Sequence, residues 1–223
     1  AAARAQCQNN LKQLGLGVHG FHDAQKRMPF NGKLVHNGDR FFNGNGCCTP
    51  AADYWSWIAR ILPYIDQGVV YDKGKIDQPG TTLNNSGILD QVFNVLLCPT
   101  DLGRNSRLVR TGQHDGLGPV GVTNYKGVSG GNWNAVGDAK WQYSPMPVNP
   151  MTLAQHDGLH FGNGIFYRMD TMVKLRLTMI TDGTSNTFMI GEAVPDRTNW
   201  NSWPHGNGAV GNAKWTGVRR SSS

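Results

Sequence analysis

The chain has 223 residues, a formal net charge of +6 and only 16% charged side chains, against about 25% in an average globular domain. Its 29 glycines and 7 tryptophans favour a β-rich protein with long ordered loops over a compact metabolic enzyme. One domain spanning residues 1–220 is expected, and Ser221–Ser223 are set aside as a tail remnant. No zinc-finger spacing, RNP aromatics or helix-turn-helix pattern accompanies the positive charge, so we expect no nucleic-acid partner.

Residues 1–24 are predicted to form one helix. Its apolar residues recur at helical spacing and form a single stripe of Cys7, Leu11, Leu14, Val18 and Phe21. The segment starts on Ala-Ala-Ala-Arg-Ala, with none of the usual N-cap residues. We therefore expect the exposed rear half of a longer helix.

The segment 25–163 is predicted to be a loop-rich insertion with a second helix near 54–67, which Pro63 should bend or end. The clearest β region is 164–194, where a tight connection at 182–186 joins two expected strands. Strands are expected at 92–97, 120–128, 165–168, 173–181 and 187–194.

Four cysteines stand at positions 7, 47, 48 and 98, without a C-x-x-C pair or zinc-like histidine spacing. The even count favours disulfides in an oxidising compartment, with buried free thiols as the alternative. A bond between Cys47 and Cys48 would close a strained ring, yet it would leave Cys7 and Cys98 as the second pair. All three pairings stay open.

The sequence offers no catalytic pattern. It lacks a G-x-S-x-G elbow, a P-loop and a dinucleotide fingerprint between a strand and a helix. We expect no enzyme activity and no organic cofactor.

The sequence suggests one candidate metal site, which is made of residues with oxygen ligands. Asp182, Asn186 and Glu192 place oxygen ligands around a hairpin, as calcium prefers. The alternative, which we favour, is that Asp182 forms an Asx turn and Gly183 takes a positive φ.

Several tryptophans stand in loops rich in glycine and asparagine. An indole in such a loop either stacks on a sugar or packs the loop onto the sheet. The first interpretation makes polysaccharide a hypothetical partner, with a ligand-binding set of Trp133, Trp141, Trp200, Trp203 and Trp215.

Four blocks occur in order along the chain: Arg4–His19, Ile61–Gln67, Leu97–Asp101 and Ile180–Glu192. In combination they resemble the large planctomycete family of prepilin-type proteins of unknown function, which is also catalogued as a bacterial solute-binding-like domain. The family usually closes with His-Pro-Gly-Gly and then Asp-Gly in a final strand. This chain lacks that ending, so its last strand is in doubt.

The resemblance implies an α+β, pilin- or pseudopilin-like fold, with a long N-terminal helix packed on an antiparallel sheet. It also implies a leader, a prepilin-peptidase site and a hydrophobic half-helix before Ala1. The location implied is the cell envelope or surface, with membrane anchoring only in the precursor and other pilin-like subunits as partners through the missing half-helix. The expected function is a structural subunit of a surface filament or secretion-type assembly. The alternative is a surface polysaccharide- or solute-binding module that uses the tryptophan loops.

Overall fold

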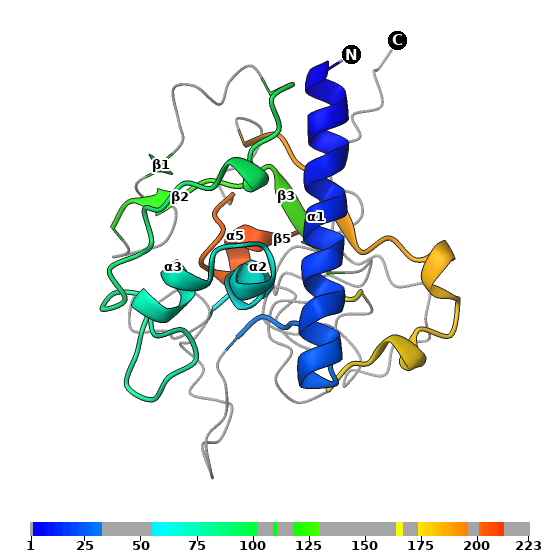
Figure 1. The fold of residues 1–223 in the computed structure, drawn as a ribbon, viewed down its shortest axis with the longest axis horizontal. Helices are drawn as coiled ribbons and strands as arrows, with labels where there is room; N and C mark the ends of the chain where they lie inside the picture. The colour runs from blue at the N-terminus through cyan, green and yellow to red at the C-terminus, as the bar shows by residue number, and fades with distance from the viewer. Residues whose placement is uncertain are drawn as a thin grey trace, which may run out of the picture.

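The computed structural model describes residues 2–32, 55–101, 109–110, 118–129, 164–166, 174–195 and 201–211. These residues form one long helix, several short helices and two small sheets (Figure 1). The predicted α+β class is confirmed. No helix in these ranges is long and apolar enough to cross a membrane.

The long helix is α1 (Ala2–Gln25), close to the predicted 1–24. Its stripe is confirmed, since Cys7, Leu14, Val18 and Phe21 are buried and Leu11 packs half-buried against the same core. The helix also buries Asn10 and Gly17, which a search for apolar residues does not flag.

Two short helices form in the region of the second predicted helix, α2 (Trp57–Ile61) and η1 (Leu62–Tyr64). A third, α3 (Gly68–Lys73), follows directly after it, where a loop was expected. Ser56 caps α2, because its Oγ accepts a hydrogen bond from the Ala59 N–H at 3.0 Å. Pro63 lies in the 3₁₀ turn that ends α2, as its sequence position predicted.

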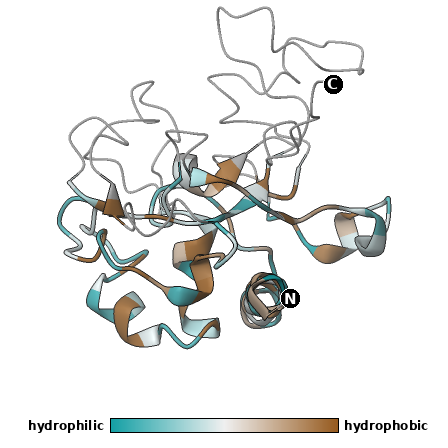
Figure 2. Cartoon of the chain, turned by 90° about the horizontal axis from the view of Figure 1, so that it is seen from above, coloured by the Kyte–Doolittle hydropathy of each residue, from teal (hydrophilic) through white to brown (hydrophobic). Residues whose placement is uncertain are grey.

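The helix α1 contacts α2 and η1 along its C-terminal half and η2 (Asn94–Leu96) nearer its N-terminus. Gly17 allows this approach, since a Cβ there would lie 2.6 Å from Ile65 Cγ2. The rings of Phe21 and Tyr64 meet edge to face, with 6.0 Å between centroids. Figure 2, which looks down the helix, shows α1 along one side of the body.

Two sheets complete the described fold. The strands β1 (Val109–Arg110) and β2 (Val120–Gly121) pair antiparallel. The second sheet has the order β4-β3-β5 and is formed by Ile190–Glu192, Tyr125–Val128 and Val210–Gly211.

The second sheet is mixed, because β3 pairs antiparallel with β4 but parallel with β5. The chain enters β5 through the short helix α5 (Gly206–Ala209) and so runs in the direction of β3. The strand β5 forms without the His-Pro-Gly-Gly segment. The expectation about a later, final strand falls on 212–223, which lie outside the described residues.

Several expected strands are wrong or shortened. The run 92–97 contains η2 instead of a strand and buries Phe93, Leu96 and Leu97, because a short apolar run satisfies either geometry. The run 120–128 splits into β2 and β3, because the Tyr125 N–H bonds Thr123 Oγ1 at 3.0 Å between them.

The expected strand 187–194 is described in full, and of it Ile190–Glu192 forms a strand, β4. The described part of 173–181 holds the 3₁₀ helix η5 (Leu177–Met179), and η6 (Thr184–Asn186) occupies the connection. Ile165 and Phe166 are buried in a bend, and 167–173 lie outside the described residues. The segment 174–189 extends from the body on the side of α1 away from α2 and α3 (Figures 1 and 2).

Candidate functional site

The first two turns of α1 are joined covalently to the body. Cys7 forms a disulfide with Cys98 across 91 residues, with the two sulfurs 2.06 Å apart. The hydroxyl of Thr100 lies 2.9 Å from Cys98 Sγ and 3.5 Å from Cys7 Sγ. This is one of the pairings that the sequence left open. Cys47 and Cys48 lie outside the described residues.

Asn10 joins the same place by hydrogen bonds. Its side-chain amide is buried and donates to the Leu97 carbonyl at 2.9 Å and to the Asn94 carbonyl at 3.5 Å. The Oδ1 atom of Asn10 accepts from Gln6 Nε2 at 2.9 Å, so the amide is satisfied on both sides.

Tyr125, the first residue of β3, reaches the helix from the sheet. Its hydroxyl donates to the Cys7 carbonyl at 3.2 Å, and its ring is fully buried. Burial raises the pKa of Tyr125 to about 12, with the charge of Glu192 adding to the rise and a hydrogen bond from Asn10 opposing it. Tyr125 therefore remains a neutral donor at physiological pH. We call Cys7, Asn10, Cys98, Thr100 and Tyr125 the helix–body junction.

Asn124 supports the junction from behind. Its Oδ1 accepts the Cys98 N–H at 3.0 Å, and its Nδ2 donates to Asp101 Oδ2 at 2.7 Å and to the Ala193 carbonyl at 3.1 Å. One buried amide thus ties the residues around the disulfide to the residue that follows β4.

Glu192 lies opposite Tyr125 in the β3–β4 pair. A carboxylate oxygen of Glu192 lies within 4.8 Å of the sulfurs of Cys7 and Cys98, the one grouping of three such ligand residues in the described ranges. Both sulfurs are in the disulfide, so neither is a thiolate that could bind an ion. The oxidised junction therefore does not have the donor set of a metal centre.

The calcium hypothesis places Asp182 and Asn186 with Glu192. In the structure, Asn186 Nδ2 donates to the Asp182 carbonyl at 3.1 Å, and Gly183 has a φ of 86°. The positive φ at Gly183 agrees with the turn interpretation. Calcium binding by the three residues stays a prediction.

Trp203 packs a loop instead of standing on the surface. Its indole is fully buried, its Nε1 donates to the Gln91 carbonyl at 2.8 Å, and its ring meets Phe93 edge to face at 5.1 Å. Trp203 is therefore wrong as a sugar-stacking residue. Four of the proposed ligand-binding tryptophans, Trp133, Trp141, Trp200 and Trp215, lie outside the described residues.

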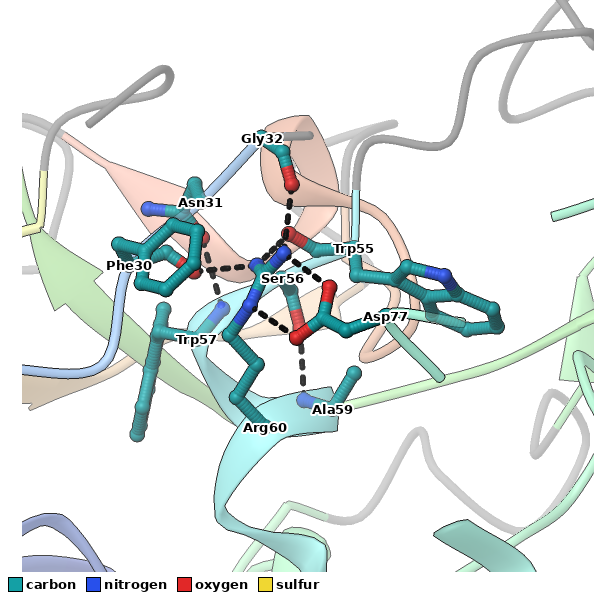
Figure 3. Close-up of polar contacts among 9 residues, drawn as sticks. All are labelled: Phe30, Asn31, Gly32, Trp55, Ser56, Trp57, Ala59, Arg60 and Asp77. Carbon is teal, nitrogen blue, oxygen red and sulfur yellow. Dashed lines mark hydrogen bonds and ion pairs between the residues drawn. The ribbon is translucent and has the colours of Figure 1, made fainter. Parts of the chain in front are cut away.

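A second buried polar cluster surrounds Arg60 (Figure 3). Its Nε and Nη2 donate to the two carboxylate oxygens of Asp77 at 2.8 and 2.6 Å. The remaining donors bind the carbonyls of Phe30, Trp55 and Gly32 at 2.6 to 2.7 Å. All five guanidinium N–H groups are used, so Arg60 fixes three chain segments and has no donor left for a ligand.

The four sequence blocks meet through these contacts. The Arg4–His19 block is most of α1, and Ile61–Gln67 packs against it at Gly17. Leu97–Asp101 supplies Cys98 and Thr100, and the last block ends on Glu192 beside them. The sequence interpretation missed Asn10, Asn124, Tyr125, Arg60 and Asp77. Of these only Asn10 carried a signal, because its spacing from Cys7 and Leu14 places it on the stripe.

A family model matches residues 1–223, the whole chain. Its description is "Protein of unknown function (DUF1559)", and its label is solute-binding-like. Comparisons with curated proteins and with solved structures found no match. The chain therefore belongs to the uncharacterised DUF1559 family.

Proposed function

We propose that this chain is the body and rear helix of a pilin-like structural subunit, in which α1 connects the body to an extracytoplasmic assembly. The observation that carries the proposal is the helix–body junction. The disulfide and the bonds of Asn10 and Tyr125 attach α1 to the body within its first two to three turns.

The position of the junction suits a helix that is pulled from its N-terminal end. Force that enters at Ala2 reaches Cys7 after about five residues, or roughly 8 Å of helix. From there a covalent bond leads to Cys98, so the rest of α1 need not resist the force alone. Packing of Gly17 and Phe21 then holds the unloaded part of the helix on η1 and on the core beside it.

The disulfide also supports a location outside the cytoplasm, because such bonds persist in oxidising compartments. In this proposal, assembly and membrane anchoring reside in an apolar half-helix N-terminal to the described helix, which the prepilin resemblance implies. The partners are other subunits of the same kind. The proposal assigns no catalytic step to the chain.

Cell fractionation of the natural precursor tests the proposal. We expect the precursor to be cleaved and to co-fractionate with the envelope or with filaments sheared from the surface. The 223-residue chain alone should be a soluble monomer. A precursor that stays in the cytoplasm, or that is released without any association, contradicts the proposal.

A control variant separates assembly from force transmission. A Cys7→Ser/Cys98→Ser precursor should still reach the envelope, because the anchoring segment is intact. Its bodies should be cut by added protease more readily during shearing, since α1 is then held on the body only by non-covalent contacts and by the main chain that follows Gln25. Equal protease sensitivity of the variant and the natural sequence would contradict the role given to the junction.

A further inference from the structure

A polar cavity of about 520 Å³ opens beside the loop that follows α3. The side chains that line it include Lys73, Lys75, Gln78, Thr81, Asn85 and Ser86. This volume falls within the range of small-molecule sites, about 300 to 1,000 Å³. We call it the loop pocket.

The charge of the loop pocket is positive. Lys73 and Lys75 line it, and no acidic side chain of the described residues does. Neither ammonium group has an ion pair or hydrogen bond with another residue of the described ranges. The acidic side chain between the two lining segments, Asp77, turns away to Arg60, which binds both of its carboxylate oxygens.

The wall of the pocket is held in place by contacts that leave little room for movement. Lys75 and Asp77 have positive φ angles of 47° and 62°, and the paired Arg60 fixes the second of them. Gly74 lies so close to Ile88 that a Cβ would be 2.2 Å from its Cδ1. The far side of the pocket is fixed by Asn85, whose amide accepts from the Thr82 N–H and donates to the Gly80 carbonyl.

These contacts leave specific groups for a ligand. The amide of Gln78 and the hydroxyl of Thr81 make no side-chain hydrogen bond within the described ranges, and both line the pocket beside the two ammonium groups. Ammonium groups bind carboxylates, whereas an amide and a hydroxyl bind neutral hydroxyls as donors and acceptors. A pre-formed wall lowers the entropy that binding must overcome.

We propose that the loop pocket binds an acidic sugar of the uronate class, with Lys73 and Lys75 holding the carboxylate and Gln78 and Thr81 contacting ring hydroxyls. The overall charge of +6 favours the approach of an acidic polysaccharide that carries such sugars. Arg60 and Asp77 act as positioning residues, because they set the shape of the wall without touching the ligand. The pocket would give the subunit a surface ligand in addition to its structural role.

Calorimetric titration with trigalacturonic acid, with neutral maltotriose as comparator, tests the proposal. The wild-type chain should bind the acid saturably and the neutral trisaccharide not at all. A Lys73→Gln/Lys75→Gln variant should bind the acid about tenfold more weakly or worse, because two charge-assisted bonds are lost. Both lysines are exposed, so the variant should keep the wild-type melting temperature.

The matched control is Lys12→Gln/Lys174→Gln, which removes the same charge at two exposed positions outside the pocket. This variant should bind like the wild type. Equal weakening in both variants would show general attraction to charge and overturn the proposal. So would the absence of saturable binding by the wild type, equal binding of maltotriose, or binding of inorganic sulfate as tight as that of the acid.

Discussion

At the scale of single residues, buried polar side chains form many of the contacts that hold separate chain segments together. Arg60 and Asp77 illustrate this, with side chains 0% and 15% exposed in a bidentate pair. Neither residue stands in a pattern that marks it in the sequence. A lone arginine beside apolar residues usually predicts a solvated charge, and only the meeting of residues 30–32, 55 and 77 gives it enough acceptors to be buried.

Asp77→Asn should therefore destabilise the protein strongly. The substitution leaves the buried Arg60 guanidinium without its counter-charge, and we expect the free energy of unfolding to fall by on the order of 3 kcal/mol. Urea denaturation measures it. The control Asp90→Asn removes an exposed carboxylate and should change the value by less than about 0.5 kcal/mol. Coinciding curves for the two variants would contradict this account of Arg60.

The raised pKa of Tyr125 predicts how the stability of the folded chain changes at alkaline pH. Its pKa is raised from 10.0 to about 12 in the folded chain, as is that of Tyr71. Between these pH values the unfolded chain releases the proton first and binds fewer protons, so stability is full below pH 10 and falls as pH rises toward 12. For Tyr125 the loss is about 2 to 3 kcal/mol across that window.

Denaturation at a series of pH values measures this decline, with Tyr125→Phe as the control. The variant should lose about 1 kcal/mol at neutral pH, because the Cys7 carbonyl loses its donor. Its decline above pH 10 should be shallower than that of the wild type, since of these two phenols Tyr71 alone remains. Parallel declines would show that the Tyr125 phenol is not protected by burial.

At the scale of elements, α1 was predictable and its neighbours were not. Five apolar residues at helical spacing specify a helix face over many turns, so neither the helix nor its buried side was ambiguous. The runs 92–97 and 173–181 are too short for periodicity to separate a 3₁₀ turn from a strand. Their hydrogen-bond partners lie elsewhere in the chain, as when the Leu97 carbonyl accepts from Asn10, and no local pattern encodes them.

Alanine substitution at two glycines of α1 is expected to change the stability of the protein in opposite directions. At Gly17 an alanine Cβ would lie 2.6 Å from Ile65 Cγ2 and 3.3 Å from Ile61 Cδ1, whereas at Gly15 it would meet nothing within 4 Å. Gly17→Ala should lower the free energy of unfolding by about 1 to 3 kcal/mol through overpacking. Gly15→Ala should raise it by up to about 1 kcal/mol through helix propensity. Thermal unfolding of the pair checks the signs, and equal shifts would contradict the packing of α1 against Ile61 and Ile65.

The disulfide is the strongest link between α1 and the rest of the described fold. A Cys7→Ala/Cys98→Ala variant removes a closure of 91 residues, which chain entropy values at about 4 to 5 kcal/mol. We expect a loss of about 2 to 5 kcal/mol in the free energy of unfolding. Guanidinium denaturation of both proteins under oxidising conditions measures the difference without touching Cys47 or Cys48. A fall of less than about 0.5 kcal/mol in the free energy of unfolding would contradict the presence of this disulfide in the folded protein.

At the scale of the whole molecule, the family resemblance carried by the four sequence blocks predicted the α+β class, and the family match covers the whole chain. The candidate site was only partly predictable. The Cys7–Cys98 bond belongs to one of the three pairings that the sequence left open. The roles of Asn124 and Tyr125 depend on β3 passing beside α1, which is a property of the assembled fold. The predicted role of Trp203 was wrong because residues 201–205 are buried as a group.

In the proposed function, force applied to α1 passes into the body at the helix–body junction. Single-molecule pulling between residue 2 and residue 195 tests it most directly. In the oxidised protein, α1 should stay on the body until the body itself unfolds, and the segment between Cys7 and Cys98, which are 91 positions apart, should not extend. Reduction should add roughly 300 Å of extension, at about 3.3 to 3.6 Å per residue. Equal extension in both states, or an oxidised helix that peels away at low force from a folded body, would contradict the claim.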